Sequence, residues 1–231
     1  VGADGTNSVI RQILVPEART DILDYAVYGK TPIQSETLDW IPDLLVDGFV
    51  RIVAPEGIGM GVATCRPVET AASARALFAP TLQLTDIPGY FSWTLSLSEA
   101  LRDADSPTLY QYARRLVKAW HPVLRRLVDE ADIPTLFPVW ISSAQPVQPW
   151  HIPNVTLLGD AIHTMSPGRG EGANVALRDA ALLRYLLVDA TANKTSLAQA
   201  IAAYEREMLR YSFEAAFNAR HKPYLASTNQ G

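Results

Sequence analysis

The segment 155–174 constrains the fold more than any other part of this 231-residue chain. It opens with a compact apolar run over residues 155–158, which is typical of a buried parallel strand. The run ends in Gly159-Asp160, and a glycine-rich loop then leads to a helical pattern over about residues 173–188. We therefore predict a parallel strand that feeds a functional loop and the start of a helix.

This strand, loop and helix can together hold a planar cofactor. A carboxylate at the carboxyl end of a parallel strand lies where open α/β sheets bind ligands, so Asp160 can accept hydrogen bonds from ribose or ribityl hydroxyls. Glycines let backbone N–H groups approach a ligand where a Cβ would collide, and three occur here, at Gly168, Gly170 and Gly172. The positive end of the following helix favours a reduced flavin, because reduction places negative charge on the ring.

The complete string is more specific than its glycines, which alone are equally typical of a simple strand-to-helix connection. Residues 159–180 resemble the motif G-D-A-x-H-x-x-x-P-x-x-G-x-G-x-N-x-A-x-x-D-A of the class A flavoprotein monooxygenases, the family of para-hydroxybenzoate hydroxylase, and match every fixed position. The resemblance implies that Asp160 contacts the ribose region of FAD and that Pro167 borders the isoalloxazine ring. It also implies that the pyrimidine end is held by Gly170, Gly172, Ala173 and Asn174.

A second string supports this resemblance. Residues 2–11 are similar to the family motif G-A-D-G-x-x-S-x-V-R. The resemblance implies that Asp4, with Gly5 and Arg11, lies at the ribose or pyrophosphate of FAD, and that Asp4 also links toward the nicotinamide cofactor. Taken alone, such a turn is more commonly just a turn and a helix cap.

The patterns and the resemblance together predict an α/β (α+β) fold. We expect an FAD/NAD(P)-binding Rossmann-like domain, incomplete at its N-terminus, with an inserted antiparallel β-sheet substrate domain and C-terminal helices. The expected parts are residues 1–20 of the FAD-binding domain, the substrate-binding sheet with a helix over 21–138, and the FAD-binding domain with the C-terminal helices over 139–231.

Local patterns place the other elements. A short helix is expected from Ser8 to about Gln12, and an apolar helical stripe covers residues 109–130, where His121-Pro122 can kink the helix. Short runs rich in aromatic and β-branched residues predict strands over 25–28, 49–53, 60–65 and 91–97.

The last helix is expected to begin with a capping box of Ser196 and Gln199. Its pattern predicts a charged face through Glu205, Arg206 and Arg210. The predicted buried face carries Leu197, Ile201, Tyr204, Met208, Tyr211 and Ala215.

One part of the family pattern is absent from the sequence. The family begins with a βαβ unit that carries G-x-G-x-x-G and holds the FAD pyrophosphate, and no such unit occurs in residues 1–231. We therefore expect the missing βαβ segment to come from a longer chain or from a partner chain. Without it, the isolated piece should bind flavin weakly.

Composition excludes several classes of function. The net charge is −4, with 20 basic and 24 acidic residues and no run of Lys or Arg, so nucleic acid is not an expected partner. The single cysteine, Cys65, favours a reducing, cytoplasmic compartment and is interpreted as a small buried hydrophobe. No apolar stretch approaches the roughly 18 residues of a membrane helix, so we expect a soluble protein. His121, His151 and His221 lack partners at metal-ligand spacing, so no metal site is predicted.

The resemblance of the two motifs implies an FAD-dependent monooxygenase. It would insert one oxygen atom from O2 into an aromatic or polyketide-like small molecule, with NAD(P)H as the reductant. The flavin carries the chemistry, so no catalytic side chain is assigned, and His163 is expected to position the loop rather than act as a base. The alternatives are a truncated, non-catalytic flavin- or ligand-binding remnant, or a related enzyme such as a halogenase, whose Trp-x-Trp-x-Ile-Pro signature residues 150–153 only partly echo.

Several residues keep two interpretations at this stage. Arg169 can attract the phosphate of NADPH or simply be an exposed loop arginine. Trp93, Trp140 and Trp150 can wall an aromatic substrate pocket or pack in the core. Three residues lie on predicted strands whose substrate-facing side the sequence leaves open: Tyr28, Arg51 and Met60.

Overall fold

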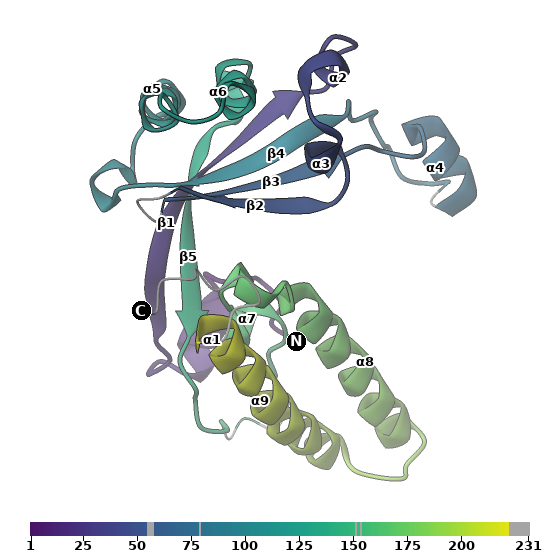
Figure 1. The fold of residues 1–231 in the computed structure, drawn as a ribbon. Helices are drawn as coiled ribbons and strands as arrows, with labels where there is room; N and C mark the ends of the chain where they lie inside the picture. Colours follow the sequence, from purple (N-terminus) through teal and green to yellow (C-terminus); the bar gives the residue numbers. More distant parts are fainter. Residues whose placement is uncertain (55–57, 79, 151, 153, 222–231) are drawn as a thin grey trace. The chain divides into compact units, whose positions relative to one another are not determined.

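A computed structural model describes residues 1–54, 58–78, 80–150, 152 and 154–221 of the chain. The chain forms two compact units. The first combines Val1–Asp24 with Ile141–Gly231 and is called here the motif unit, and the second, Tyr25–Trp140, is called the sheet unit. The mixed α/β fold with one antiparallel sheet confirms the predicted fold class (Figure 1). Among the described residues, no helix is both long and apolar enough to cross a membrane.

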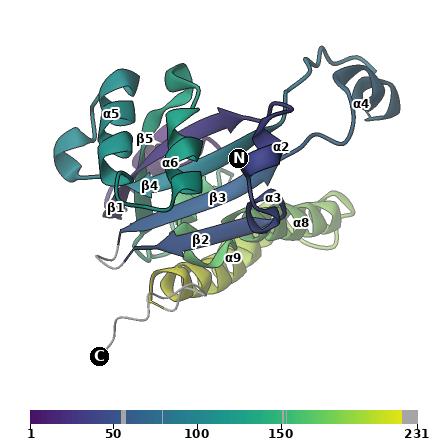
Figure 2. The ribbon, with the colours of Figure 1, turned by 45° about the horizontal axis from the view of Figure 1, so that its top comes forward.

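The sheet has five strands in the order β2-β3-β4-β1-β5 (Figures 1 and 2). The pairs β2–β3, β3–β4 and β1–β4 are antiparallel. The four strands predicted over 25–28, 49–53, 60–65 and 91–97 are confirmed, and β5 is an addition that its sequence pattern did not reveal. The strands are β1 (Thr20–Pro32), β2 (Phe49–Val53), β3 (Gly59–Cys65), β4 (Tyr90–Ser96) and β5 (Phe137–Ala144).

Side chains alternate between the two faces of the sheet, as the period of a strand requires. One face is apolar and fully buried, and in β4 it carries Phe91, Trp93 and Leu95. It packs against helices of the same unit, which lie on one side of the strands in Figure 1. Cys65, at the end of β3, was expected to be buried but is only half-buried. The helices of this unit are α2 (Thr37–Trp40), α3 (Asp43–Val46), α4 (Ala71–Phe78), η1 (Glu99–Leu101), α5 (Ser106–Leu116), α6 (Pro122–Asp129) and η2 (Ile133–Thr135).

The predicted helix over residues 109–130 is two helices, α5 and α6, so the expectation of one kinked helix was wrong. α5 ends at Leu116, and His121 starts α6 as its N-cap, with the ring nitrogen Nδ1 accepting a hydrogen bond from the N–H of Val123. Pro122 occupies the first position of α6, where its missing N–H costs nothing. Separate caps at this point break the helix completely.

The motif unit contains α1 (Val9–Leu14), α7 (Asp160–His163), η3 (Pro167–Arg169), α8 (Gly172–Thr191) and α9 (Leu197–His221). The capping box of α9 is confirmed, because the N–H of Gln199 donates to Ser196 and the N–H of Ser196 donates to the Gln199 side chain. Two details of the predicted amphipathic pattern were wrong. Leu197 is 51% exposed because it lies in the first turn, whereas Glu205 is 4% exposed and belongs to the buried face.

The predicted strand over residues 155–158 is reduced to one parallel bridge between Gly2 and Leu157. The N–H of Gly2 donates to Thr156 at 2.7 Å, and the N–H of Leu158 donates to Gly2 at 3.0 Å. The ladder stops there because the chain after Gly2 turns at Gly5, where φ is +76°. The expectation of a regular strand was therefore wrong, although the parallel pairing that it implied is present.

Candidate functional site

A glycine with unusual backbone angles forms the turn from the apolar run into α7. Gly159 has φ 63° and ψ −147°, a region that only glycine adopts readily. A Cβ on Gly159 would also lie 3.3 Å from the Cβ of Ala176 in α8. The tight turn and the close approach of α8 thus both require glycine at this position.

A buried carboxylate holds this turn in place. Asp179, on α8, is fully buried and accepts three hydrogen bonds. The N–H of Gly159 lies 2.8 Å from Oδ2, and Nε2 of His163 lies 2.5 Å from the same oxygen. The hydroxyl of Tyr211, on α9, donates to Oδ1 at 2.6 Å. Asp179 therefore ties together α7, α8 and α9 behind the glycine turn.

The positions of His163 and Tyr211 suit a structural role in this network. His163 is fully buried and its Nε2 is engaged by Asp179, which supports positioning of the loop rather than proton transfer to a ligand. Burial, reinforced by the hydrogen bond to Asp179, raises the pKa of Tyr211, so its hydroxyl stays a neutral donor. Tyr204, also on α9, makes a similar buried hydrogen bond, because its hydroxyl donates to the carbonyl of Leu157 at 2.9 Å.

The two sequence motifs, more than 140 residues apart in the chain, lie side by side in the motif unit. Nη1 of Arg11 donates to the carbonyl of Ala161 at 2.8 Å, and Nη2 donates to the carbonyl of Thr6 at 2.8 Å. The hydroxyls of Thr6 and Thr164 are 3.1 Å apart. Arg11 was predicted to contact the cofactor, and here its guanidinium joins the first motif to the turn of the second.

Asp4 caps helix α1. Its carboxylate accepts from the hydroxyl of Ser8 at 2.6 Å and from the N–H of Val9 at 2.8 Å. The hydrogen bond from Ser8 is the largest cause of the lowered pKa of Asp4. Asp4 remains exposed, so capping leaves its outer lone pairs accessible to a ligand.

The loop and the start of α8 surround a cavity of about 530 Å³. Asp160 and Pro167 line it, and so do residues of the first motif. Six of the nine predicted cofactor residues are in its wall, namely Gly5, Asp160, Pro167, Gly170, Gly172 and Ala173. Asp4, Arg11 and Asn174 are outside that wall.

Three features make this cavity fit a flavin. Asp160 is exposed and has no hydrogen-bond partner for its side chain among the described residues, so its oxygens are available to ligand hydroxyls. No side-chain hydrogen bond caps α8, which leaves the N–H groups of its first turn directed at the cavity. A Cβ on Gly170, where φ is +65°, would meet no described atom within 4 Å, so this glycine leaves room for a ligand.

Asn174 and Arg169 line a neighbouring hollow of about 490 Å³ between η3, α8 and α9. The guanidinium of Arg169 pairs with Glu171 at 3.1 Å, and Arg178 lies over the ring of Tyr211, 3.8 Å from its centroid. The pairing of Arg169 within its own loop favours the interpretation that it shapes the loop.

The tryptophans are placed differently from one another. Trp93 is 1% exposed in the core of the sheet unit, with Nε1 donating to Thr31 at 3.1 Å. Trp150 is 8% exposed in the core of the motif unit, whereas Trp140 is 53% exposed. Core packing therefore accounts for Trp93 and Trp150, and only Trp140 is accessible to a ligand.

The strand registers settle which sheet residues share a face. Met60 is 1% exposed and lies on the helix-covered face, so it does not contact a ligand outside the core. Tyr28 lies opposite Thr94, and Arg51 lies opposite Gly61, on the other face.

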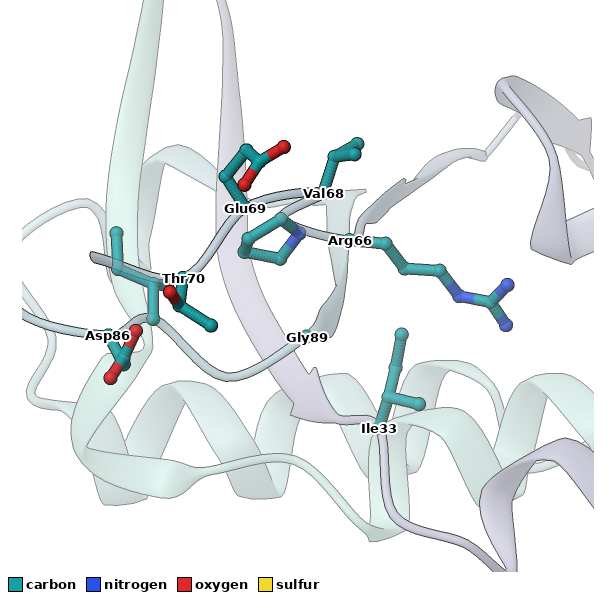
Figure 3. Close-up of a pocket in the computed structure, with 9 residues that line it drawn as sticks. Ile33, Arg66, Val68, Glu69, Thr70, Asp86 and Gly89 are labelled. Carbon is teal, nitrogen blue, oxygen red and sulfur yellow. The ribbon is translucent and has the colours of Figure 1, made fainter. Parts of the chain in front are cut away.

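A hollow of about 410 Å³ lies at the end of the sheet near α4 (Figure 3). Its carboxylates serve α4, because Asp86 accepts from the N–H of Ala71 at 2.6 Å and Glu69 accepts from the hydroxyl of Ser73. Arg66 points away from both acids in Figure 3. This arrangement brings no reactive groups together.

The two other described histidines, His121 and His221, make local contacts within their helices. His121 caps α6, and His221 ends α9 with Nδ1 3.0 Å from the carbonyl of Phe217. His151 lies outside the described residues. No group of three or more His, Cys, Asp or Glu side chains in the described residues could hold a metal ion.

The sequence pattern placed Tyr204 and Tyr211 on the buried face of α9 but did not predict their hydrogen bonds. Tyrosine rather than phenylalanine at a fully buried position signals a partner for the hydroxyl. That signal was available, but the identity of the partners was not.

Comparison with known proteins decides the family. Residues 1–216 match the model of the FAD binding domain family. The chain belongs to this FAD-binding family. The match identifies FAD as the cofactor and confirms the resemblance drawn from the two motifs.

Curated relatives of this FAD-binding chain are larger proteins. It is 30% identical, over 92% of its length, to the dual O-methyltransferase/FAD-dependent monooxygenase elcB of Phaeosphaeria nodorum, of which it covers 27%. It is 28% identical, over 89% of its length, to hispidin-3-hydroxylase of Neonothopanus nambi, of which it covers 48%. The chain thus spans about a quarter to a half of the length of these relatives.

Solved structures share the fold. A protein from Photorhabdus luminescens assigned as an FAD-containing monooxygenase is 28% identical, with a TM-score of 0.78 over 96% of this chain and 60% of that one. HpxO from Klebsiella pneumoniae, solved with FAD and uric acid, is 22% identical, with a TM-score of 0.69 over 95% of this chain and 49% of that one. The second likeness supports the fold alone.

Proposed function

We propose that this chain is part of an FAD-dependent monooxygenase, a hydroxylase that inserts one oxygen atom from O2 into an aromatic or polyketide-like small molecule. The family match and the names of the relatives support this proposal. The observation that carries it is the cavity at the start of α8, which combines an unpartnered carboxylate, an uncapped helix N-terminus and space left by glycines.

Within that cavity, we assign the isoalloxazine and ribityl parts of FAD to residues of both motifs. The carboxylate of Asp160 would accept from sugar hydroxyls, and Pro167 would border the ring. Gly170, Gly172, Ala173 and Asn174 would present backbone N–H groups to the pyrimidine end, and Asp4, Gly5 and Arg11 would lie toward the ribose or pyrophosphate. For Arg11 the role is indirect, because its guanidinium is engaged by two backbone carbonyls.

When bound, FAD would supply the redox chemistry, namely hydride uptake from NAD(P)H and activation of O2 for transfer of one oxygen atom to the substrate. The chain's own contribution is electrostatic and geometric. The positive end of α8 stabilises negative charge beside it, and this stabilisation is stronger where water is excluded. Asp179, His163 and Tyr211 hold the loop so that these N–H groups keep their direction. We propose that the sheet unit binds the substrate.

The test is a turnover assay on the purified protein. FAD, NADH or NADPH, ¹⁸O₂ and a panel of phenolic substrates are supplied, and the products are analysed by mass spectrometry. We expect nicotinamide oxidation stimulated by a phenol and one ¹⁸O atom in the product. Asp160→Ala should lower FAD occupancy, while Asp189→Ala, a half-buried position near the far end of α8, should leave it unchanged.

Flavin binding without nicotinamide oxidation or oxygen incorporation on any substrate would contradict the monooxygenase proposal. It would instead support the non-catalytic flavin-binding alternative. A halogenated product formed with halide present would support the third alternative.

A further inference from the structure

The second hollow of the motif unit lies between η3 and the facing sides of α8 and α9, two helices that lie side by side (Figure 1). We call it the α8–α9 hollow. Its volume of about 490 Å³ is within the roughly 300–1,000 Å³ of small-molecule sites. Residues at helical spacing line it from both sides, namely Asn174 and Arg178 on α8 and Tyr211, Glu214 and Asn218 on α9.

A guanidinium group lies over an aromatic ring in this hollow. The guanidinium carbon of Arg178 is 3.8 Å from the ring centroid of Tyr211. Tyr211 is 6% exposed, whereas Arg178 is exposed, so one face of the guanidinium covers the ring and the opposite face is open. The hydroxyl of Tyr211 is held by Asp179 at 2.6 Å, which fixes the ring beneath the guanidinium. A planar guanidinium held in this way can stack on a second planar group such as a nucleobase.

Several polar side chains of the hollow have unused hydrogen-bonding capacity. Within the described residues, four of them make no hydrogen bond or ion pair, namely those of Asn174, Arg178, Glu214 and Asn218. Asn218 is half-buried, where an unsatisfied amide is costly. Together these groups supply both donors and acceptors to a ligand.

The charges of the hollow favour a neutral base over an anion. Arg169 pairs with Glu171 at 3.1 Å, and the other two charged side chains, Arg178 and Glu214, have opposite signs. A phosphate site is normally built from an excess of cations. Amides and a carboxylate beside a guanidinium plane instead match the edge of a planar heterocycle, and asparagine forms paired hydrogen bonds with adenine.

The hollow and the flavin cavity share the first turn of α8. Gly172 and Ala173 line the flavin cavity, whereas the next two residues, Asn174 and Val175, line the hollow. A ligand that extends across this turn therefore reaches both sites.

We propose that the α8–α9 hollow binds an adenine base, and that this base belongs to the reductant NAD(P)H. The base stacks on Arg178, its 6-amino group donates to the carboxylate of Glu214, and the amides of Asn174 and Asn218 donate to its ring nitrogens. The inference rests on the proposed function, because it takes the ligand to be the co-substrate of the enzyme.

Matched nucleotides test recognition of the base without turnover. Dissociation constants of adenosine, inosine and nicotinamide 5′-monophosphates (AMP, IMP and NMN) are measured by calorimetry. The protein is loaded with one equivalent of FAD, so that the adenine site of the cofactor itself is occupied. All three probes carry the same phosphate, but IMP has an oxo group in place of the 6-amino group and NMN has no purine. We expect AMP to bind about tenfold more tightly than IMP, and NMN to bind least tightly.

Three variants separate the contacts with the base from effects on folding. Arg178→Met should weaken AMP binding about tenfold, because methionine still covers the ring of Tyr211 but lacks the planar cation. Glu214→Gln should reduce the preference for AMP over IMP to less than twofold, because a glutamine amide can donate to the oxo group of IMP. Arg184→Met is the matched control, an exposed position on α8 outside the hollow, and should leave AMP affinity unchanged.

Competition identifies the source of the base. NAD⁺ should displace AMP, and the KM for NADH should rise about tenfold in Arg178→Met, as AMP affinity falls. The KM for reduced NMN, which has no adenine, should stay the same. AMP that remains bound at saturating NAD⁺ would assign the hollow to a separate nucleotide and contradict the assignment to the reductant.

Two results would overturn the adenine subsite: equal affinities of the wild type for AMP and IMP, or a change of less than twofold in AMP affinity in Arg178→Met. Either can occur while ¹⁸O incorporation succeeds, so the inference can fail alone. Conversely, Arg178-dependent AMP binding in a protein without oxygen incorporation would leave the subsite intact and contradict only the monooxygenase proposal.

Discussion

Replacing Asp179 with asparagine tests whether the buried network holds the cofactor loop. Asp179→Asn keeps the size of the side chain but removes its charge and one of its two acceptor oxygens. The wild-type carboxylate accepts from Gly159 at 2.8 Å, His163 at 2.5 Å and Tyr211 at 2.6 Å. The amide oxygen can serve one side of this network, while the NH2 group faces the other.

The expected loss follows from these three bonds. A hydrogen bond to a charged group contributes about 1.5–3 kcal/mol, against about 0.5–1.5 kcal/mol for a neutral one, so each bond weakens by roughly 1 kcal/mol. Relief of the desolvation of a buried carboxylate offsets part of the total. We expect the free energy of unfolding to fall by about 2–4 kcal/mol and FAD affinity to fall with it.

The assay is urea denaturation without FAD, followed by FAD titration of the folded variant. Asp189→Asn on the same helix is the control, because Asp189 makes an exposed ion pair with Lys194 at 2.9 Å that contributes about 0–1 kcal/mol. If Asp179→Asn lost no more stability than Asp189→Asn and bound FAD normally, the network would not have the role given to it.

Three further changes test other parts of the structure. Gly170→Val should weaken FAD binding at least tenfold, because the valine side chain enters the cavity, while its left-handed backbone lowers the free energy of unfolding by only about 1–2 kcal/mol. An unchanged FAD affinity, measured by flavin fluorescence, would place the ligand elsewhere. Ser196→Ala should lower the free energy of unfolding by about 1 kcal/mol in urea denaturation, because it removes the acceptor for the N–H of Gln199. A loss below roughly 0.3 kcal/mol, about the limit of detection, would argue against the cap. Burial raises the pKa of Glu205 from 4.5 to about 7, against smaller opposing effects of Thr156 and Trp150, so its contribution to stability is complete below about pH 4.5 and is lost as pH rises through about 7. Glu205→Gln should therefore unfold at a higher temperature than the wild type at pH 8, with the difference disappearing near pH 4.5; calorimetry showing the same difference at both pH values would contradict the assignment.

The sequence predicted the local parts of this structure well. The run of aromatic and β-branched residues over 49–53 predicted β2 with the bounds that the structure has, and the capping box predicted the start of α9. Both signals are local, because the period of a strand and the reciprocal bonds of a cap depend on residues close in the chain. The motif over residues 159–180 could be recognised for the same reason, because all its residues are close in the sequence.

Features that depend on tertiary contacts were not predicted. Glu205 was assigned to an exposed face because a glutamate on an amphipathic helix is normally solvated, yet α9 buries it. The long-range partner of Arg11 was not predicted either, because the carbonyl of Ala161 that accepts from its guanidinium is 150 residues away in the sequence. The hydrogen bonds of Asp179 to three separate segments likewise have no signature in the chain order.

A crystal structure of the protein at saturating FAD tests whether the flavin binds at the start of α8. We expect an isoalloxazine ring bordered by Pro167, with its pyrimidine edge at the backbone N–H groups that begin α8 and a sugar hydroxyl hydrogen-bonded to Asp160. A flavin bound away from these residues, or an empty cavity at the start of α8 when FAD is bound elsewhere on the protein, would contradict it.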